Sequence, residues 1–72
     1  MQVGEAARKL RKMYDDAEKN EKALSIHLFG ITYADALVGM PLREIAIEAD
    51  LPESYQTEIR KGMKLAKYVR LR

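Results

Sequence analysis

Apolar residues recur at helical spacing from the start of the chain. In residues 3–20, "VGEAARKLRKMYDDAEKN", the apolar positions lie three or four residues apart, which marks one face of a helix. These positions are Val3, Ala7, Leu10, Tyr14 and Ala17. The pattern predicts an amphipathic helix that ends near Asn20, a residue type that tolerates the end of a helix.

Residues 21–39 have apolar side chains around much of the predicted helix. One line consists of Leu24, Leu28, Ile31 and Val38, and a neighbouring line consists of Ile26, Phe29, Tyr33 and Leu37. A surface this wide predicts the central, most buried helix. Gly30 costs about 1 kcal/mol of helix propensity relative to alanine, which indicates a close crossing of another helix at this point. Gly39 is predicted to end the segment.

Two further helices are predicted at residues 41–50 and 52–66. Pro41 and Pro52 suit the first turn of a helix, where the missing N–H has no intrahelical partner. The inward positions are predicted to be Leu42, Ile45, Ala46 and Ala49 in the first helix, and Tyr55, Ile59 and Met63 in the second. Gly62 either caps the second helix or lets it continue.

The chain then ends in "KYVRLR", where polar and apolar residues alternate. A period of two predicts a short strand or an extended arm, and fraying is the alternative. A strand would need to pair with another segment or a second chain. The sequence as a whole predicts a single all-α domain over residues 1–72. It is a small bundle of about four helices with a short extended basic C-terminal tail.

Charge is distributed unevenly along this predicted bundle. The formal net charge is +2, but residues 60–72 carry +6 and the remainder carries −4. The bases of this segment are Arg60, Lys61, Lys64, Lys67, Arg70 and Arg72. Clustered charge of one sign indicates a surface that attracts anions. The alternative is a solvated helix end, where cations complement the macrodipole.

The inventory of reactive side chains favours a protein that is not an enzyme. There is no cysteine, which excludes disulfides and cysteine-zinc clusters, and there are only two serines and one histidine. His27 lies within the most apolar segment, has no neighbours at metal-ligand spacing, and is interpreted as a core or boundary histidine. No glycine-rich phosphate loop is present. We expect no cofactor and no metal.

The chain also lacks a segment that predicts membrane insertion or secretion. The longest mainly apolar run, residues 23–38, is interrupted by polar side chains and is a poor bilayer span. Charges recur every few residues near the N-terminus, unlike the apolar core of a signal peptide. A cytoplasmic protein with no membrane partner is expected.

Residues 42–59 have the spacing of a helix-turn-helix motif. The matching apolar and small positions are Ile45, Ala46, Ala49, Leu51 and Ile59. "LREIAIEADL" resembles the support helix and turn of bacterial and archaeal DNA-binding domains in the helix-turn-helix superfamily. Asp50 stands where that superfamily usually has the turn glycine, and Asp can adopt a left-handed conformation only at more cost than glycine. Asp50 and Glu53 also have capping-box spacing, and Gln56 occupies a position that is usually apolar.

A second resemblance covers more of the chain. "IHLFGITYADAL" followed by "SYQTEIRKGMKLAKYVRL" is similar to a small prokaryotic helix-turn-helix-like domain family. Members of that family also occur attached to larger proteins, some of which are related to restriction systems. The resemblance implies a helix-turn-helix-like fold and a regulatory or defence-associated setting.

The last predicted helix carries the candidate DNA-binding residues. Gln56, Arg60, Lys64 and Lys67 are spaced by four, four and three residues on one face. We expect double-stranded DNA to be bound with Gln56, Arg60 and Lys64 near the bases. The phosphate backbone would be contacted by Lys61, Lys67, Arg70 and Arg72. A monomer with so few contacts would bind weakly, so specificity would require a homodimer or a larger protein assembly.

Acidic residues support a competing hypothesis. Glu53 and Glu58 lie on the same predicted helix and would repel phosphates, and Glu58 is spaced to pair with Lys61. Acids dominate the middle of the chain at Asp35, Glu44, Glu48, Asp50, Glu53 and Glu58, against Arg43 alone. Such a surface could dock a basic protein, since a fold does not determine function. The alternative function is therefore a protein-protein interaction or adaptor module that binds no nucleic acid.

Overall fold

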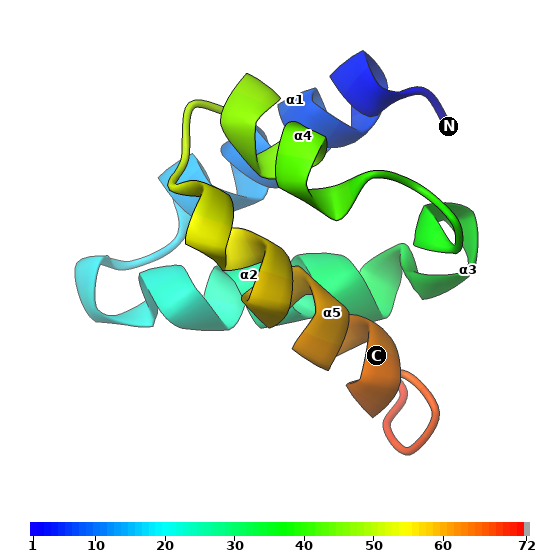
Figure 1. Cartoon of the computed structure of the whole chain (residues 1–72). Helices are drawn as coiled ribbons and strands as arrows, with labels where there is room; N and C mark the ends of the chain where they lie inside the picture. The colour runs from blue at the N-terminus through cyan, green and yellow to red at the C-terminus, as the bar shows by residue number, and fades with distance from the viewer. Residues whose placement is uncertain (72) are drawn as a thin grey trace.

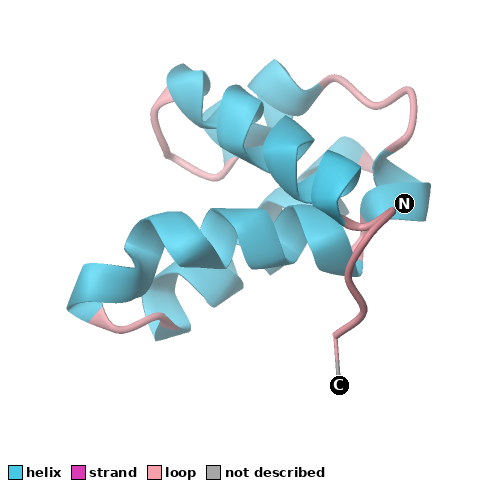
Figure 2. Cartoon of the chain, turned by 90° about the horizontal axis from the view of Figure 1, so that it is seen from below, coloured by secondary structure: helices cyan, strands magenta, loops and turns pink. Residues whose placement is uncertain are grey.

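The computed structural model describes residues 1–71 and consists of helices and loops (Figure 1). The α-helices in that range are α1 (Val3–Asp16), α2 (Lys22–Thr32), α3 (Ala34–Leu37), α4 (Leu42–Glu48) and α5 (Gln56–Leu65). Turns of 3-10 helix at Lys19–Glu21 and Glu53–Tyr55 precede α2 and α5. The predicted all-α fold is confirmed, because no strand occurs in the described residues (Figure 2).

The predicted helix over residues 21–39 is divided in two. Tyr33, with φ −112° and ψ 22°, interrupts it between α2 and α3. The break follows Ile31 and Thr32, two β-branched residues that fit helices less well, and the Thr32 hydroxyl donates to the Leu28 carbonyl at 2.7 Å. Such back-bonding bends helices. Gly39 has φ +79°, and the turn there separates α3 from α4 as predicted.

The C-terminal tail departs from α5 without forming a strand. The chain makes a turn after Leu65, and residues 69–71 lie outside any helix. Figure 2 shows this segment as a loop that projects from the helices. The predicted strand is therefore wrong for the residues described, which form a turn followed by a loop. Within residues 1–71, no helix is both long enough and apolar enough to cross a bilayer.

The core forms where α1, α2, α4 and α5 face one another, and Leu37 of α3 is also buried in it. Its largest fully buried side chains are Leu10, Ile26, Phe29, Leu37, Ile45 and Ile59. The predicted inward positions of α4, which are Leu42, Ile45, Ala46 and Ala49, are all buried. Of the two apolar lines predicted for the central helix, only the line through Ile26, Phe29 and Leu37 is buried. The other line was wrongly predicted as core, since Leu24 is 46% exposed and Val38 is 72% exposed.

Two glycines allow α2 and α5 to cross closely. A Cβ atom on Gly30 would overlap the carbonyl oxygen of Ile59 and would come within 2.9 Å of the Gly62 Cα. A Cβ on Gly62 would likewise overlap the carbonyl oxygen of His27. The crossing predicted from Gly30 is confirmed. Gly62 does not cap α5, because the helix continues to Leu65.

A tight turn links α4 to α5 and sets the direction of α5. Asp50 has φ +59°, the left-handed conformation expected at the position of the usual turn glycine. Its N–H donates to the Ile47 carbonyl at 2.9 Å, and the Leu51 N–H donates to the Ala46 carbonyl at 3.0 Å, which together make a Schellman motif. The capping box with Glu53 is wrong, because Asp50 lies in the turn after α4 and no side chain caps the 3-10 turn at Glu53–Tyr55.

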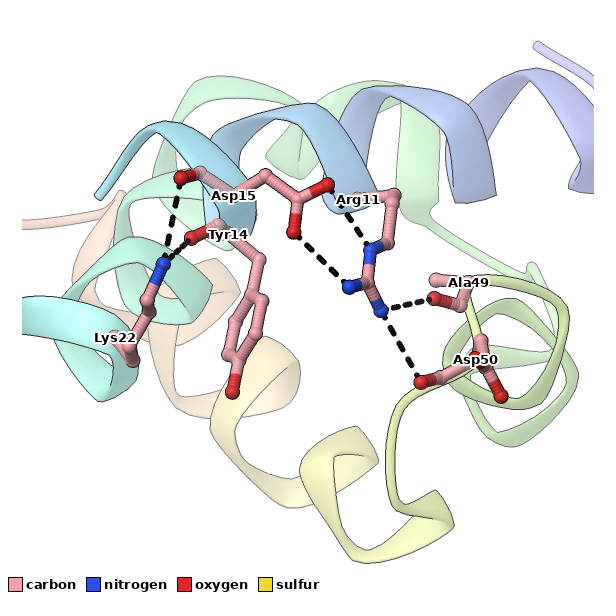
Figure 3. A network of polar contacts seen from close by, with 6 residues as sticks. All are labelled: Arg11, Tyr14, Asp15, Lys22, Ala49 and Asp50. Carbon is pink, nitrogen blue, oxygen red and sulfur yellow. Dashed lines mark hydrogen bonds and ion pairs between the residues drawn. The ribbon is translucent and has the colours of Figure 1, made fainter. Parts of the chain in front are cut away.

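Cationic side chains donate hydrogen bonds to the carbonyl oxygens at the C-terminal ends of α1 and α4 (Figure 3). Arg11 of α1 donates from one guanidinium nitrogen to the carbonyls of Ala49 and Asp50, each at 3.2 Å, and its other nitrogens bind Asp15. Lys22 donates to the Tyr14 carbonyl at 2.6 Å. Helix C-termini present unpaired carbonyls and partial negative charge. Lys22 therefore stabilises the end of α1 at Asp16, four residues before the predicted end at Asn20.

Candidate nucleic-acid interface

The outer face of α5 brings three of the predicted basic residues together. Ile59 and Gly62 are buried against α2, and the opposite side of the helix carries Arg60, Lys61 and Lys64, all exposed. These three side chains and Thr57 line one shallow depression. We call Thr57, Arg60, Lys61 and Lys64 the basic face. It is a compact exposed surface able to bind an anion through charge and hydrogen bonding.

Thr57 was missed by the sequence analysis. Its hydroxyl donates to the Ser54 carbonyl at 2.7 Å, which holds the side chain at the start of α5. The spacing along the sequence could have placed Thr57 on this face, because it lies three, four and seven residues before Arg60, Lys61 and Lys64. Those are the spacings of one helical face. The DNA-binding face predicted from the sequence included Gln56 instead, and this residue is half-buried at the edge of the basic face.

The remaining predicted residues lie further from the basic face. Lys67 is in the turn after α5, where it joins Arg60 and Lys64 along a second groove between α3 and α5. Asp35 lines the same groove and brings negative charge to that edge. Arg70 lies in the tail beside the C-terminal end of α2. Arg72 lies outside the described residues.

Both acids of the last predicted helix are held by side chains from other helices. Arg43 of α4 pairs with Glu53 at 3.0 Å. His27 of α2 donates from Nε2 to the Glu58 carboxylate at 2.6 Å. The hydrogen bond from His27, assisted by the nearby Lys61 ammonium, lowers the pKa of Glu58 below its usual value. Each carboxylate that would repel phosphate is thus compensated by a donor. Glu58 also pairs with Lys61 of the basic face at 3.4 Å, so the pair predicted from their spacing is confirmed.

His27 occupies the boundary between core and solvent. Its side chain is 27% exposed, and Glu58 is similarly half-buried at 28%. The interpretation of His27 as a boundary histidine fits this position. In residues 1–71, no group of three or more histidine and acidic side chains is arranged to hold a metal ion.

The other acids of the middle of the chain are dispersed. Asp35 lies on α3, Glu44 and Glu48 lie on α4, and Asp50 lies in the following turn, all of them exposed. Glu53 is engaged by Arg43, and Glu58 by His27. The six acids predicted as one docking surface are therefore spread over several elements, and two of them are already paired.

Comparison with known proteins assigns the chain to a family. The model of a family described as an HTH-like domain matches residues 2–72, nearly the whole chain. No curated protein matched the chain, and no solved structure matched it. The family match agrees with the observed order of α4, a tight turn and α5.

Proposed function

The chain belongs to the HTH-like domain family, and from this premise we propose that it binds double-stranded DNA through the basic face of α5. Arg60 and Lys64 would approach the base edges, and Lys61 and Lys67 would contact phosphates. Arginine pairs with guanine edges through two parallel hydrogen bonds, whereas ammonium groups act on phosphate as point charges. The domain would act as a non-catalytic module in a regulatory or defence-associated protein of the cytoplasm.

The observation that carries this proposal is the grouping of cations on the outer face of α5. Arg43 holds Glu53, and Glu58 is hydrogen-bonded to His27 and also pairs with Lys61 at 3.4 Å. A phosphate near the basic face would thus meet Arg60 and Lys64, together with Lys61, whose charge Glu58 partly offsets. Paired charges contribute little to the field felt by a third ion at a distance.

The arrangement of α4 and α5 also favours this use of the helix. In DNA-binding helix-turn-helix proteins the second helix enters the major groove and the first helix supports it. Here α4 is fixed by burial of Ile45 and Ala46 and by the Arg11 contacts at its end. The second helix, α5, is held at one angle through the Gly62 crossing. Its basic face is left exposed on a rigid element.

The proposal is tested by fluorescence anisotropy of a labelled random duplex. A random duplex offers few preferred bases, so in it Arg60 and Lys64 would contact phosphates together with Lys61 and Lys67. With these four phosphate contacts, affinity should fall ~100-fold between about 50 and 200 mM salt. The double variant Arg60→Ala/Lys64→Ala should weaken binding and reduce the log-log salt slope by about two. It should leave the helical circular dichroism spectrum intact, because both side chains are exposed.

A matched control exists on α1. Arg8 and Lys12 are exposed, four residues apart, and carry the same two charges as Arg60 and Lys64. Arg8→Ala/Lys12→Ala should bind nearly as the wild type does. Equal losses in the two double variants would assign binding to net charge and reject the basic face. An absence of binding at both salt concentrations would favour the protein-protein interaction module.

A further inference from the structure

The outer side of α2 carries an apolar stripe that the core does not use. Leu24, Leu28 and Ile31 are spaced by four and three residues, on the side of the helix away from Ile26 and Phe29. Leu24 is 46% exposed, and the other two are half-buried. We call these three residues the α2 stripe. Exposed apolar residues that form a continuous surface mark an interaction site.

An acidic groove adjoins the N-terminal end of the α2 stripe. Its volume is about 390 Å³, and its apolar floor includes Met13 of α1 together with Leu24 and Leu28. Its charged lining consists of Asp16, Glu18 and Glu21. Asp16 is paired with Lys12 at 3.0 Å, so the other two acids supply most of the free charge. The groove therefore suits a segment that is both apolar and basic.

The segment after α5 has that composition. Residues 66–71 contain Lys67 and Arg70 and no acid. Their large apolar members, Tyr68, Val69 and Leu71, are all exposed, with Tyr68 at 83%. We call residues 66–71 the basic tail. It complements the acidic groove in charge and in apolar surface.

The groove and the tail lie at opposite ends of α2. The groove includes Glu18 and Glu21, before the helix, whereas Val69 and Leu71 lie beside Ile31 and Thr32 at its C-terminal end. Figure 1 shows the turn before α2 at one end of this helix and the loop after α5 toward the other end. An 11-residue helix is ~16 Å long.

We propose that two copies of this chain pair through their antiparallel α2 stripes, with the basic tail of each copy in the acidic groove of the other. A two-fold axis through the middle of the α2 stripe brings each tail to the partner's groove, because groove and tail mark the two ends of the same helix. The interface is isologous and closes at two copies. This inference does not depend on DNA binding.

The interface combines apolar burial with charge pairing. The α2 stripe lies between the two tail contacts, so its leucines and isoleucine lose water when the helices meet. Lys67 and Arg70 then face Glu18 and Glu21 of the other copy. Three stripe residues and a short tail form a small interface, and small interfaces are weak. The dimer should therefore dissociate in the micromolar to millimolar range.

Sedimentation equilibrium of the chain without DNA measures this association. The weight-average mass should rise from the monomer value toward twice that value between about 10 µM and 1 mM protein, the range expected of a small interface. Added salt should reduce the rise, because the charges of the groove and tail are exposed. A mass that stays at the monomer value throughout overturns the proposal.

Charge reversal tests the pairing of tail with groove. Glu18→Lys/Glu21→Lys reverses the groove, and Lys67→Glu/Arg70→Glu reverses the tail. Each variant alone should remain monomeric at concentrations where the wild type is half dimeric. An equimolar mixture should dimerise again, because each reversed groove then meets a reversed tail and each native groove a native tail.

Matched controls separate this pairing from changes in net charge. Glu5→Lys/Glu44→Lys makes the same charge change at two exposed acids outside the groove, and should dimerise like the wild type. Leu24→Ser should lower the association constant at least tenfold, whereas Val38→Ser, at a more exposed site on the far side of the α2–α3 break, should not. Failure of the mixture to recover association would reject the tail-groove contact.

Discussion

The two helices that cross at Gly30 and Gly62 resemble one another inside the bundle and differ outside it. Toward the core, α2 buries Ile26 and Phe29, and α5 buries Ile59. Away from it, α2 presents the apolar stripe, whereas α5 presents the basic face. The inner faces satisfy the same requirement, which is to exclude water from one core. The outer faces are free of that requirement, so their chemistry indicates what each helix binds.

The largest expected change in the free energy of unfolding distinguishes the inner from the outer positions of α2. Ile26→Ala removes a fully buried side chain and leaves a cavity, so it should lower the free energy of unfolding by about 3 to 4 kcal/mol. Leu24→Ala, at an exposed position, should change it by less than about 0.5 kcal/mol. Urea denaturation of dilute protein measures both. Equal losses would mean that Leu24 belongs to the core.

A smaller loss is expected where the two helices cross. Gly62→Ala places a methyl group against the His27 carbonyl and the Gly30 Cα, and backbone atoms cannot move aside as a side chain can. The helices must separate, at a net cost of about 2 kcal/mol after the gain in helix propensity.

Gly4→Ala is the control for the crossing. The nearest atom to its new methyl would be 3.6 Å away, an ordinary contact, so this variant should gain up to about 1 kcal/mol in α1. Thermal unfolding followed by circular dichroism distinguishes the two glycine variants. A stabilised Gly62→Ala variant would contradict the close crossing.

The inner faces could be predicted from the sequence, and the outer faces only in part. Leu42, Ile45 and Ala49 lie at helical spacing, and that local pattern was enough to place them in the core. Leu24 has the same spacing, but its exposure depends on which side of α2 has neighbours. Which side of a helix is covered depends on the packing of the folded chain, and the spacing of apolar residues does not reveal it.

Contacts between distant residues were equally beyond prediction. Arg11 reaches the carbonyls of Ala49 and Asp50 from 38 and 39 residues away, and His27 reaches Glu58 across 31 residues. Helix-surface pairs are predictable because i,i+4 geometry is fixed by the helix itself. The sequence could locate Glu53 and Glu58, but it could not indicate that side chains from α4 and α2 hold them.

The turn before α5 should respond to substitution with a gain in stability. Asp50 adopts φ +59°, which an L-residue occupies at a cost of about 1 kcal/mol and glycine occupies freely. Asp50→Gly should therefore raise the free energy of unfolding by about 0.5 to 1 kcal/mol. The contact with Arg11 is retained, because Arg11 binds the main-chain carbonyl of this residue.

Asp50→Ala separates the backbone effect from loss of the carboxylate. Alanine removes the same side-chain charge but keeps the Cβ that disfavours a left-handed conformation. It should be less stable than Asp50→Gly in the same urea titration. Equal stability of the glycine and alanine variants would show that the left-handed conformation costs the turn nothing.

The smallest effect concerns the contact that joins the outer edges of α2 and α5. The pKa of Glu58 is lowered in the folded chain, chiefly by the hydrogen bond from His27. A carboxyl with a lowered folded pKa contributes stability that is fully present above its unfolded pKa of ~4.3 and is lost as the pH falls through the folded pKa. Glu58→Gln should therefore be less stable than the wild type at pH 6, and the difference should shrink below about pH 4.3. Urea midpoints measured at several pH values give this difference.

Glu44→Gln, at an exposed acid of α4, is the control and should show a nearly constant difference from the wild type across the same pH range. A constant difference for Glu58→Gln as well would mean that the carboxylate of Glu58 gains nothing from His27 on folding.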